Sequence, residues 1–245
     1  MAFSAIYDLV VDERDIRIYS NGTGAPVLML PDLGSSAATW ECLTGRVCEQ
    51  DRQIVAIDLP GTGHSDPVRG SDLAAFVEHL QSVVEQLGRD PIDLVGCGFG
   101  GYLVASLAAR EPSLVRRLIL ENPSLPPRSG PPVRSRMAPS MAISGAVTTL
   151  RRGRIKQNVL GFSRAKAVLD QLARADPSWW AALAQITAPT LVIGSGSTEV
   201  ADRALLDLLA GAIPGAVRAD LPTGRRGHGQ DPDGFAAAMM PFLAA

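Results

Sequence analysis

Apolar runs of strand length alternate along the chain with stretches in which apolar residues recur at helical spacing. Residues 27–30 and 54–57 are apolar on both faces, which is typical of parallel strands buried between helices. The alternation predicts an α/β fold with a doubly wound, mostly parallel sheet and helices on both faces. Further predicted elements are an edge hairpin at 6–19, strands at 92–95, 118–120, 191–193 and near 217, and helices at 39–47, 73–87, 102–108, 200–209 and 235–242, with Ser71 or Asp72 capping the helix at 73–87.

Composition narrows the class of protein. The chain has 245 residues, 46% of them hydrophobic, which suits one α/β domain with a sizeable core. A formal net charge of -2 indicates neither nucleic acid nor a membrane as a partner. Cys42, Cys48 and Cys97 have no disulfide or metal-ligand spacing, and we find no leader and no apolar run of about 18 residues, so we expect a soluble, cytoplasmic protein. We expect no metal and no cofactor, and the sequence leaves the oligomeric state open.

The segment at residues 94–102, Leu-Val-Gly-Cys-Gly-Phe-Gly-Gly-Tyr, joins a predicted strand to a predicted helix through small residues. This order matches the nucleophile elbow Gly-x-Ser-x-Gly, in which a strained turn lifts one side chain above the edge of the sheet. Gly98 stands at the central position and offers no atom to attack with. The apex needs a positive φ, which glycine adopts at almost no cost, so the turn can persist without its nucleophile.

Three more motifs appear in the order typical of one family. They are Pro-Asp-Leu-Gly-Ser-Ser at 31–36, Asp-Leu-Pro-Gly-Thr-Gly-His-Ser at 58–65 and Ala-Pro-Thr-Leu-Val-Ile-Gly at 188–194. With the elbow, they make the chain resemble the α/β-hydrolase superfamily over nearly its whole length. The resemblance implies a hydrolase core at residues 1–123 and 186–245 and a cap inserted at residues 124–185.

The resemblance also implies that the catalytic triad is lost. The family's acid position carries Ser197, and the position seven residues before Pro232, which commonly holds the histidine, carries Arg225. Gly98, Ser197 and Arg225 are therefore the degenerate triad positions. His228 falls where many relatives have a second, noncatalytic histidine, although a loop deletion would return it to the position of the base. Cys97 is the alternative nucleophile, but the residue before the apex ordinarily points into packing.

What remains is a pair of backbone donors and a set of candidate acid–base groups. In the family, the oxyanion hole consists of two amides, whose counterparts here belong to Leu33 and Phe99. These amides could stabilise an enolate as well as a tetrahedral oxyanion. The candidate bases are Asp32 and His228, and a substrate that carries its own base is a third possibility. Alternatively, Asp32 caps a turn or pairs with an arginine such as Arg225.

The predicted cap is strongly basic. Between Glu121 and Asp170 every charged residue is basic, which suggests an anionic ligand, because a cleft lined by one sign of charge concentrates the opposite charge. The alternative is a solvated basic surface. Side chains that we expect to contact a substrate are Cys97, Met137, Met141, Trp179 and Trp180.

Three functions follow from these residues. The first is a nonhydrolytic enzyme that moves a proton next to a carbonyl, as an epimerase or isomerase. It would be similar to the atypical group that includes the peptide epimerase of bottromycin biosynthesis, with a small-molecule or peptide substrate that carries a carboxylate. The second is a catalytically inactive protein that binds a ligand or a partner. The third is a hydrolase that uses Cys97 or His228. Arg225 stays a candidate for the site in each case.

Overall fold

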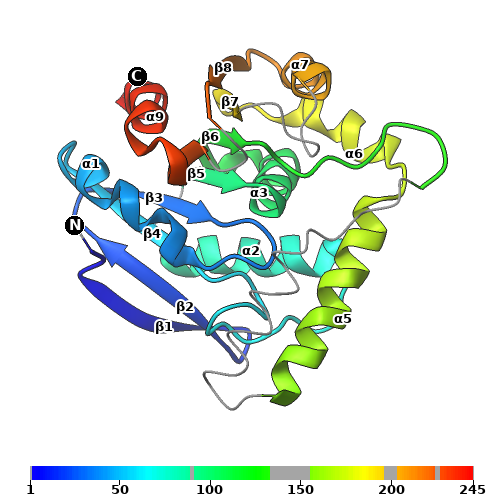
Figure 1. Ribbon diagram of the computed structural model, residues 1–245, viewed down its shortest axis with the longest axis horizontal. Helices are drawn as coiled ribbons and strands as arrows, with labels where there is room; N and C mark the ends of the chain where they lie inside the picture. Colours follow the sequence, from blue (N-terminus) through cyan, green and yellow to red (C-terminus); the bar gives the residue numbers. More distant parts are fainter. Residues whose placement is uncertain (1, 89–90, 133–154, 196–202, 224–226, 245) are drawn as a thin grey trace.

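An eight-stranded sheet organises the computed structural model, which describes residues 2–88, 91–132, 155–195, 203–223 and 227–244. The strand order is β1-β2-β4-β3-β5-β6-β7-β8. Pairing is antiparallel between β1 and β2 and between β2 and β4, and parallel in every other pair. The doubly wound, mostly parallel sheet predicted from the sequence is therefore confirmed (Figure 1).

The described strands agree with the predicted ones. They are β1 Ala5–Val11, β2 Arg14–Asn21, β3 Ala25–Leu30, β4 Arg52–Ile57, β5 Ile92–Cys97, β6 Val115–Glu121, β7 Thr190–Ser195 and β8 Val217–Leu221. The edge hairpin formed by β1 and β2 has Asp12 and Glu13 at its turn, both with positive φ. Strands β3 and β5 lie at the centre of the sheet, and their carboxyl ends meet at one edge, where ligands bind in open α/β sheets.

The helices cover both faces of the sheet. They are η1 Ala37–Leu43, α1 Thr44–Cys48, α2 Leu73–Leu87, α3 Phe99–Arg110, η2 Pro112–Leu114, α5 Ile155–Leu172, α6 Pro177–Ala182, η3 Leu183–Gln185, α7 Arg203–Ala212, α8 Gly227–Gln230 and α9 Pro232–Ala244. As expected, the Asp72 side chain caps α2 by accepting a hydrogen bond from the Ala75 amide. The short helix predicted at 39–47 begins earlier and is partly 3-10, because the Ser36 hydroxyl caps its start.

Two hydrophobic clusters lie on opposite faces of the sheet. On one face, side chains of α2, α3 and α6 pack together and include Phe99, Tyr102 and Trp179. On the other face, η1, α1 and α9 contribute a second cluster that includes Trp40 and Phe235. Successive side chains of a strand point to opposite faces of the sheet, and the side chain of Cys97 belongs to this second cluster. Phe99, just after the turn, belongs to the first. The elbow therefore separates its two neighbouring side chains onto opposite faces.

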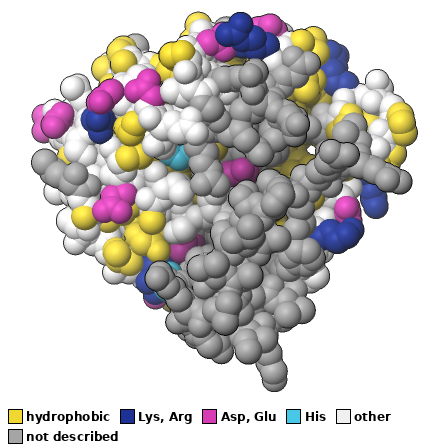
Figure 2. All heavy atoms as spheres, viewed as in Figure 1, with side chains coloured by type: hydrophobic (Ala, Val, Ile, Leu, Met, Phe, Trp, Pro, Cys, Tyr) yellow, Lys and Arg dark blue, Asp and Glu magenta, His cyan; other side chains and the backbone are white. Residues whose placement is uncertain are grey.

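The segment between β6 and β7 includes the long helix α5 and the short helix α6, and α5 stands along one side of the sheet in Figure 1. In Figure 2, which views the molecule from the same side as Figure 1, positive and negative side chains are scattered over the described part of the surface. Most of the basic residues that suggested an anionic ligand lie in residues 133–154, outside the described part of the chain. The cap boundaries at 124 and 185 and the electropositive lining stay predictions.

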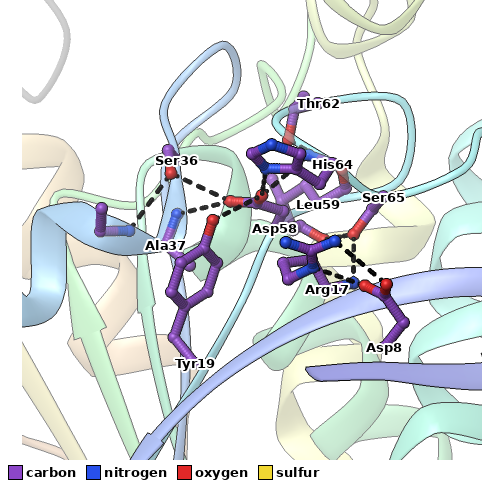
Figure 3. Close-up of polar contacts among 11 residues, drawn as sticks. Asp8, Arg17, Tyr19, Ser36, Ala37, Asp58, Leu59, Thr62, His64 and Ser65 are labelled. Atoms are coloured by element: carbon purple, nitrogen blue, oxygen red, sulfur yellow. Dashed lines mark hydrogen bonds and ion pairs between the residues drawn. The ribbon is translucent and has the colours of Figure 1, made fainter. Parts of the chain in front are cut away.

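The buried carboxylate of Asp58 joins three segments near the carboxyl edge of the sheet (Figure 3). Its Oδ1 accepts hydrogen bonds from the Ser36 hydroxyl at 3.1 Å and the Ala37 amide at 2.9 Å. Its Oδ2 accepts from the Tyr19 hydroxyl at 3.3 Å and the His64 amide at 2.9 Å. The motif at 58–65 thus holds the loop after β4 against the loop after β3.

Replacement of Asp58 by Ala should destabilise the fold strongly. It leaves the Ala37 and His64 amides without this acceptor, and each such loss costs about 1–3 kcal/mol. We therefore expect a loss of at least about 2 kcal/mol in the free energy of unfolding, measured by urea denaturation. Asp8→Ala is the control, because the Asp8–Arg17 ion pair is solvent-exposed and should contribute less than about 1 kcal/mol. Equal losses in the two variants would contradict the organising role of Asp58.

His79 on α2 should make stability depend on pH. Burial lowers the pKa of His79, and this effect outweighs the opposing influence of the Asp12 carboxylate. The unfolded chain then binds more protons than the folded chain, so the free energy of unfolding falls as the pH drops below about 6.5. His79→Gln should reduce this slope in urea titrations between about pH 5 and pH 7. An unchanged slope would show that His79 takes up no additional proton when the protein unfolds.

Candidate active site

The elbow is built by close approach of small residues at the carboxyl end of β5. Gly98, between β5 and α3, has φ 54° and ψ -119°, the positive φ expected from the sequence. A side chain at Gly96 would overlap the backbone of Gly100, and one at Gly100 would overlap the end of β3. The turn therefore has a positive φ at its apex and close backbone packing on both sides, while the apex residue has no side chain.

The carboxylate of Asp32 occupies the space that a side chain at the apex would need. A Cβ atom added at Gly98 would overlap the Oδ1 and Cγ atoms of Asp32. Asp32 is half-buried and follows β3, the strand beside β5. A carboxylate from the loop after β3 thus lies where a side chain at the apex would lie.

Both predicted oxyanion donors bind this carboxylate. The amides of Leu33 and Phe99 each donate a hydrogen bond of 2.8 Å to Asp32 Oδ1. The structure therefore brings Asp32, Leu33 and Phe99 together, as the sequence predicts, but the donors are already engaged. A substrate oxygen reaches them only if the Asp32 side chain moves. Of the two interpretations of Asp32, turn capping describes these contacts directly, while its role as a base stays a prediction.

A second set of polar groups lies on the α9 face of the sheet. His228 in α8 places Nδ1 2.5 Å from Glu121 Oε2, and its backbone amide donates to Glu121 Oε1 at 3.1 Å. Glu121 at the end of β6 is 0% exposed, and His228 is 2% exposed. Trp40 stacks on the imidazole with ring centroids 4.0 Å apart. His228 thus retains an orienting carboxylate, supplied by β6.

Sequence reasoning missed Glu121, because it sought the acid only after the seventh strand. The available signal was an ionisable residue ending the otherwise apolar run at 118–120. A carboxylate in a buried strand needs a partner, which directs attention to the few polar residues able to reach it. Next to Glu121, Asn122 bonds Ser195 on β7 through both its side-chain oxygen and nitrogen, which fixes the ends of the two strands.

Cys97 is buried, at 3% exposure, as its position before the apex suggests. Its Sγ, one oxygen of Glu121 and one ring nitrogen of His228 all lie within 4.8 Å of one another. The surroundings of the thiol are therefore polar as well as apolar. Its predicted contact with a substrate stays a prediction.

Of the other predicted site residues, two lie in the hydrophobic core and four lie outside the described part of the chain. Trp179 and Trp180 are buried, and their indole N–H groups donate to Ser106 Oγ and to the carbonyl of Pro126, each at 2.8 Å. Trp179 also stacks on Tyr102 in the core. Ser197, Arg225, Met137 and Met141 lie outside the described residues, so their predicted roles stay predictions.

The sequence comparison agrees with this architecture. The sequence profile of the alpha/beta hydrolase fold family matches residues 25–180. The chain therefore belongs to the α/β-hydrolase fold family, as its resemblance predicted. No helix within the described residues is long and apolar enough to span a bilayer.

Known relatives match only part of their own length. The chain is 27% identical over 257 residues to polyketide synthase ThaQ of Burkholderia thailandensis, covering 93% of this chain and 12% of that protein. It is 36% identical over 107 residues to 2-hydroxymuconate semialdehyde hydrolase of Pseudomonas putida, covering 42% of this chain and 38% of that protein. The chain thus spans less than half the length of either relative.

Among solved structures, the chain is similar to a variant of the N-formylmaleamic acid deformylase Nfo from Pseudomonas putida. The superposition has a TM-score of 0.78 and 19% sequence identity, and covers 96% of this chain and 99% of that one. At this identity the likeness concerns the fold alone.

Restoring a serine at the apex should not by itself create a hydrolase. In Gly98→Ser the new side chain meets Asp32, whose carboxylate also binds the two predicted oxyanion donors. The double variant Gly98→Ser/Asp32→Gly removes both obstacles and keeps the His228–Glu121 pair. We expect p-nitrophenyl acetate turnover above background only in the double variant, because freed oxyanion donors contribute about 10²–10³ in rate.

The matched control is the triple variant that adds His228→Gln, which should return turnover to background. Equal activity in the single and double serine variants would show that Asp32 does not obstruct the site.

Proposed function

We propose that this chain is a nonhydrolytic enzyme on an α/β-hydrolase scaffold, in which Asp32 moves a proton next to a substrate carbonyl group. The reaction class is epimerisation or isomerisation. The observation that carries the proposal is the substitution at the elbow, where the apex is Gly98 and the Asp32 carboxylate fills its place with Oδ1 on the two oxyanion amides.

These contacts suit an acid–base group. The amides of Leu33, in the loop after β3, and Phe99, at the start of α3, fix the position of one carboxylate oxygen. A fixed carboxylate beside a substrate loses little orientational freedom on reaching the transition state, which is the advantage of a positioned base.

The proposed substrate class rests on the composition of the chain and on the name of one relative. We propose a small-molecule or peptide intermediate of natural-product biosynthesis, in keeping with the name of the polyketide synthase relative. The basic composition of residues 124–166 favours a substrate that carries a carboxylate. We also propose a reducing, cytoplasmic location, since Cys42, Cys48 and Cys97 form no disulfide bond in the structure.

A ligand-binding protein without catalysis is the second candidate. The hydrogen bonds of Asp32 favour this candidate. Its carboxylate already accepts from the two amides that would otherwise stabilise a reaction intermediate. A hydrolase that uses Cys97 or His228 is the third. The proximity of these residues to Glu121 favours it, whereas their burial opposes access by a substrate.

Deuterium exchange tests the proposal. Carbonyl compounds with a stereocentre next to the carbonyl, including modified peptides and polyketide thioesters, are incubated with the protein in D2O. We expect deuterium at the stereocentre by mass spectrometry, and a loss of about 10²–10⁴ in rate for Asp32→Asn, which keeps an acceptor for the two amides but is a much weaker base.

Asp72→Asn is the matched control, because asparagine also caps helices and Asp72 lies outside the site. It should leave the exchange rate unchanged. Exchange that persists at the wild-type rate in Asp32→Asn would overturn the role of Asp32. Binding of the compounds without any exchange would support the second candidate, and ester turnover lost in Cys97→Ser would support the third.

A further inference from the structure

We propose that Cys97, Glu121 and His228 form a binding site for one thiophilic divalent cation, with Zn²⁺ as the best match. The site includes Cys97 at the end of β5 and lies on the α9 face of the sheet, next to Trp40 and Phe235. The proposal does not depend on the proposed function, since it rests only on the buried groups.

The three donors are the types that Zn²⁺ prefers. A thiolate, an imidazole nitrogen and a carboxylate oxygen bind Zn²⁺ at about 2.0–2.3 Å in tetrahedral geometry. The candidate donor atoms lie within 4.8 Å of one another. The Nδ1–Oε2 distance of 2.5 Å between His228 and Glu121 has to widen by about 1 Å for a shared ion, which a small rotation of either side chain provides.

Neighbouring groups hold the donors in position. Cys97 and Glu121 are paired residues at the ends of β5 and β6, so the sheet register sets their separation. The His228 amide donates to Glu121 Oε1, which orients the carboxylate. Trp40 stacks on the imidazole. Metal sites commonly depend on such outer contacts, which fix the orientation of each ligand.

An independent observation also points to a ligand. His228 Nε2 is buried and has no hydrogen-bond partner within the part of the chain that the structure describes. An unsatisfied buried polar nitrogen is unfavourable, and metal coordination is one way to use the lone pair of an imidazole. Either ring nitrogen of a histidine can coordinate Zn²⁺.

Electrostatics favours a cation in this place. Glu121 is fully buried, and ionising the Cys97 thiol beside it would add a second negative charge in a medium where isolated charges are costly. A divalent ion neutralises both ligands, and its binding releases the thiol proton to solvent. Three protein ligands leave one tetrahedral position for a water molecule or another small ligand.

Cys42 is close but is not included in the site. Its thiol donates to the carbonyl oxygens of His228 at 3.1 Å and Thr39 at 3.4 Å. Burial raises the pKa of the Cys42 thiol, which disfavours the thiolate. It therefore provides a matched cysteine that should not coordinate the ion.

Titration of Co²⁺ into the reduced, chelator-treated protein tests the site. Co²⁺ reports both thiolate coordination, through an ultraviolet charge-transfer band, and tetrahedral geometry, through its visible bands. We expect one Co²⁺ per chain, displaced by Zn²⁺. Cys97→Ser should abolish the charge-transfer band and weaken binding at least about 10–100-fold, while Cys42→Ser should retain both.

Circular dichroism establishes that each variant is folded, and Glu121→Gln provides a second ligand substitution with little change in size. Its expected effect is weaker binding with the charge-transfer band preserved at saturation. The proposal is overturned if the wild-type protein shows no charge-transfer band, or if the band survives in Cys97→Ser and disappears in Cys42→Ser.

Discussion

The Asp32 carboxylate accepts hydrogen bonds from the amides of Leu33 and Phe99, and these two bonds join the loop after β3 to the start of α3. The arrangement requires Gly98, because any side chain at the apex would overlap the carboxylate. The glycine at the apex and the placement of the Asp32 carboxylate are therefore one structural feature. The negative charge expected on a reaction intermediate of a hydrolase is supplied here by the protein itself.

Two sets of ionisable groups near the elbow differ in their burial. Asp32 is half-buried at the carboxyl edge of the sheet, whereas His228 and Glu121 are enclosed by Trp40 and the helices of the α9 face. Partial exposure suits proton exchange with a substrate, while full burial suits a fixed pair or a bound ion. The positive φ of Gly98 permits this division, because the chain turns sharply between Cys97 and Phe99.

Membership of the α/β-hydrolase fold family accounts for the scaffold but leaves the chemistry open. The family profile and the similar solved structures agree on the sheet and its helices. A fold hosts many reactions, and the reaction depends on the groups placed at its site. Here the apex of the elbow is Gly98, and the Asp32 carboxylate, from the loop after β3, accepts hydrogen bonds from the Leu33 and Phe99 amides. These two features distinguish the chain from a hydrolase with an intact elbow.

The sequence by itself determined the strand and helix order, the turn at Gly98 and the absence of a serine nucleophile there, because hydrophobic periodicity and glycine preference are local properties. It also placed Asp32 near the two amides by resemblance to the family. Only the tertiary structure decided that both amides bind one oxygen of Asp32, and that Glu121 pairs with His228 across a sequence separation of 107 residues. Such contacts depend on strand register and on the packing of distant helices, which no local pattern encodes.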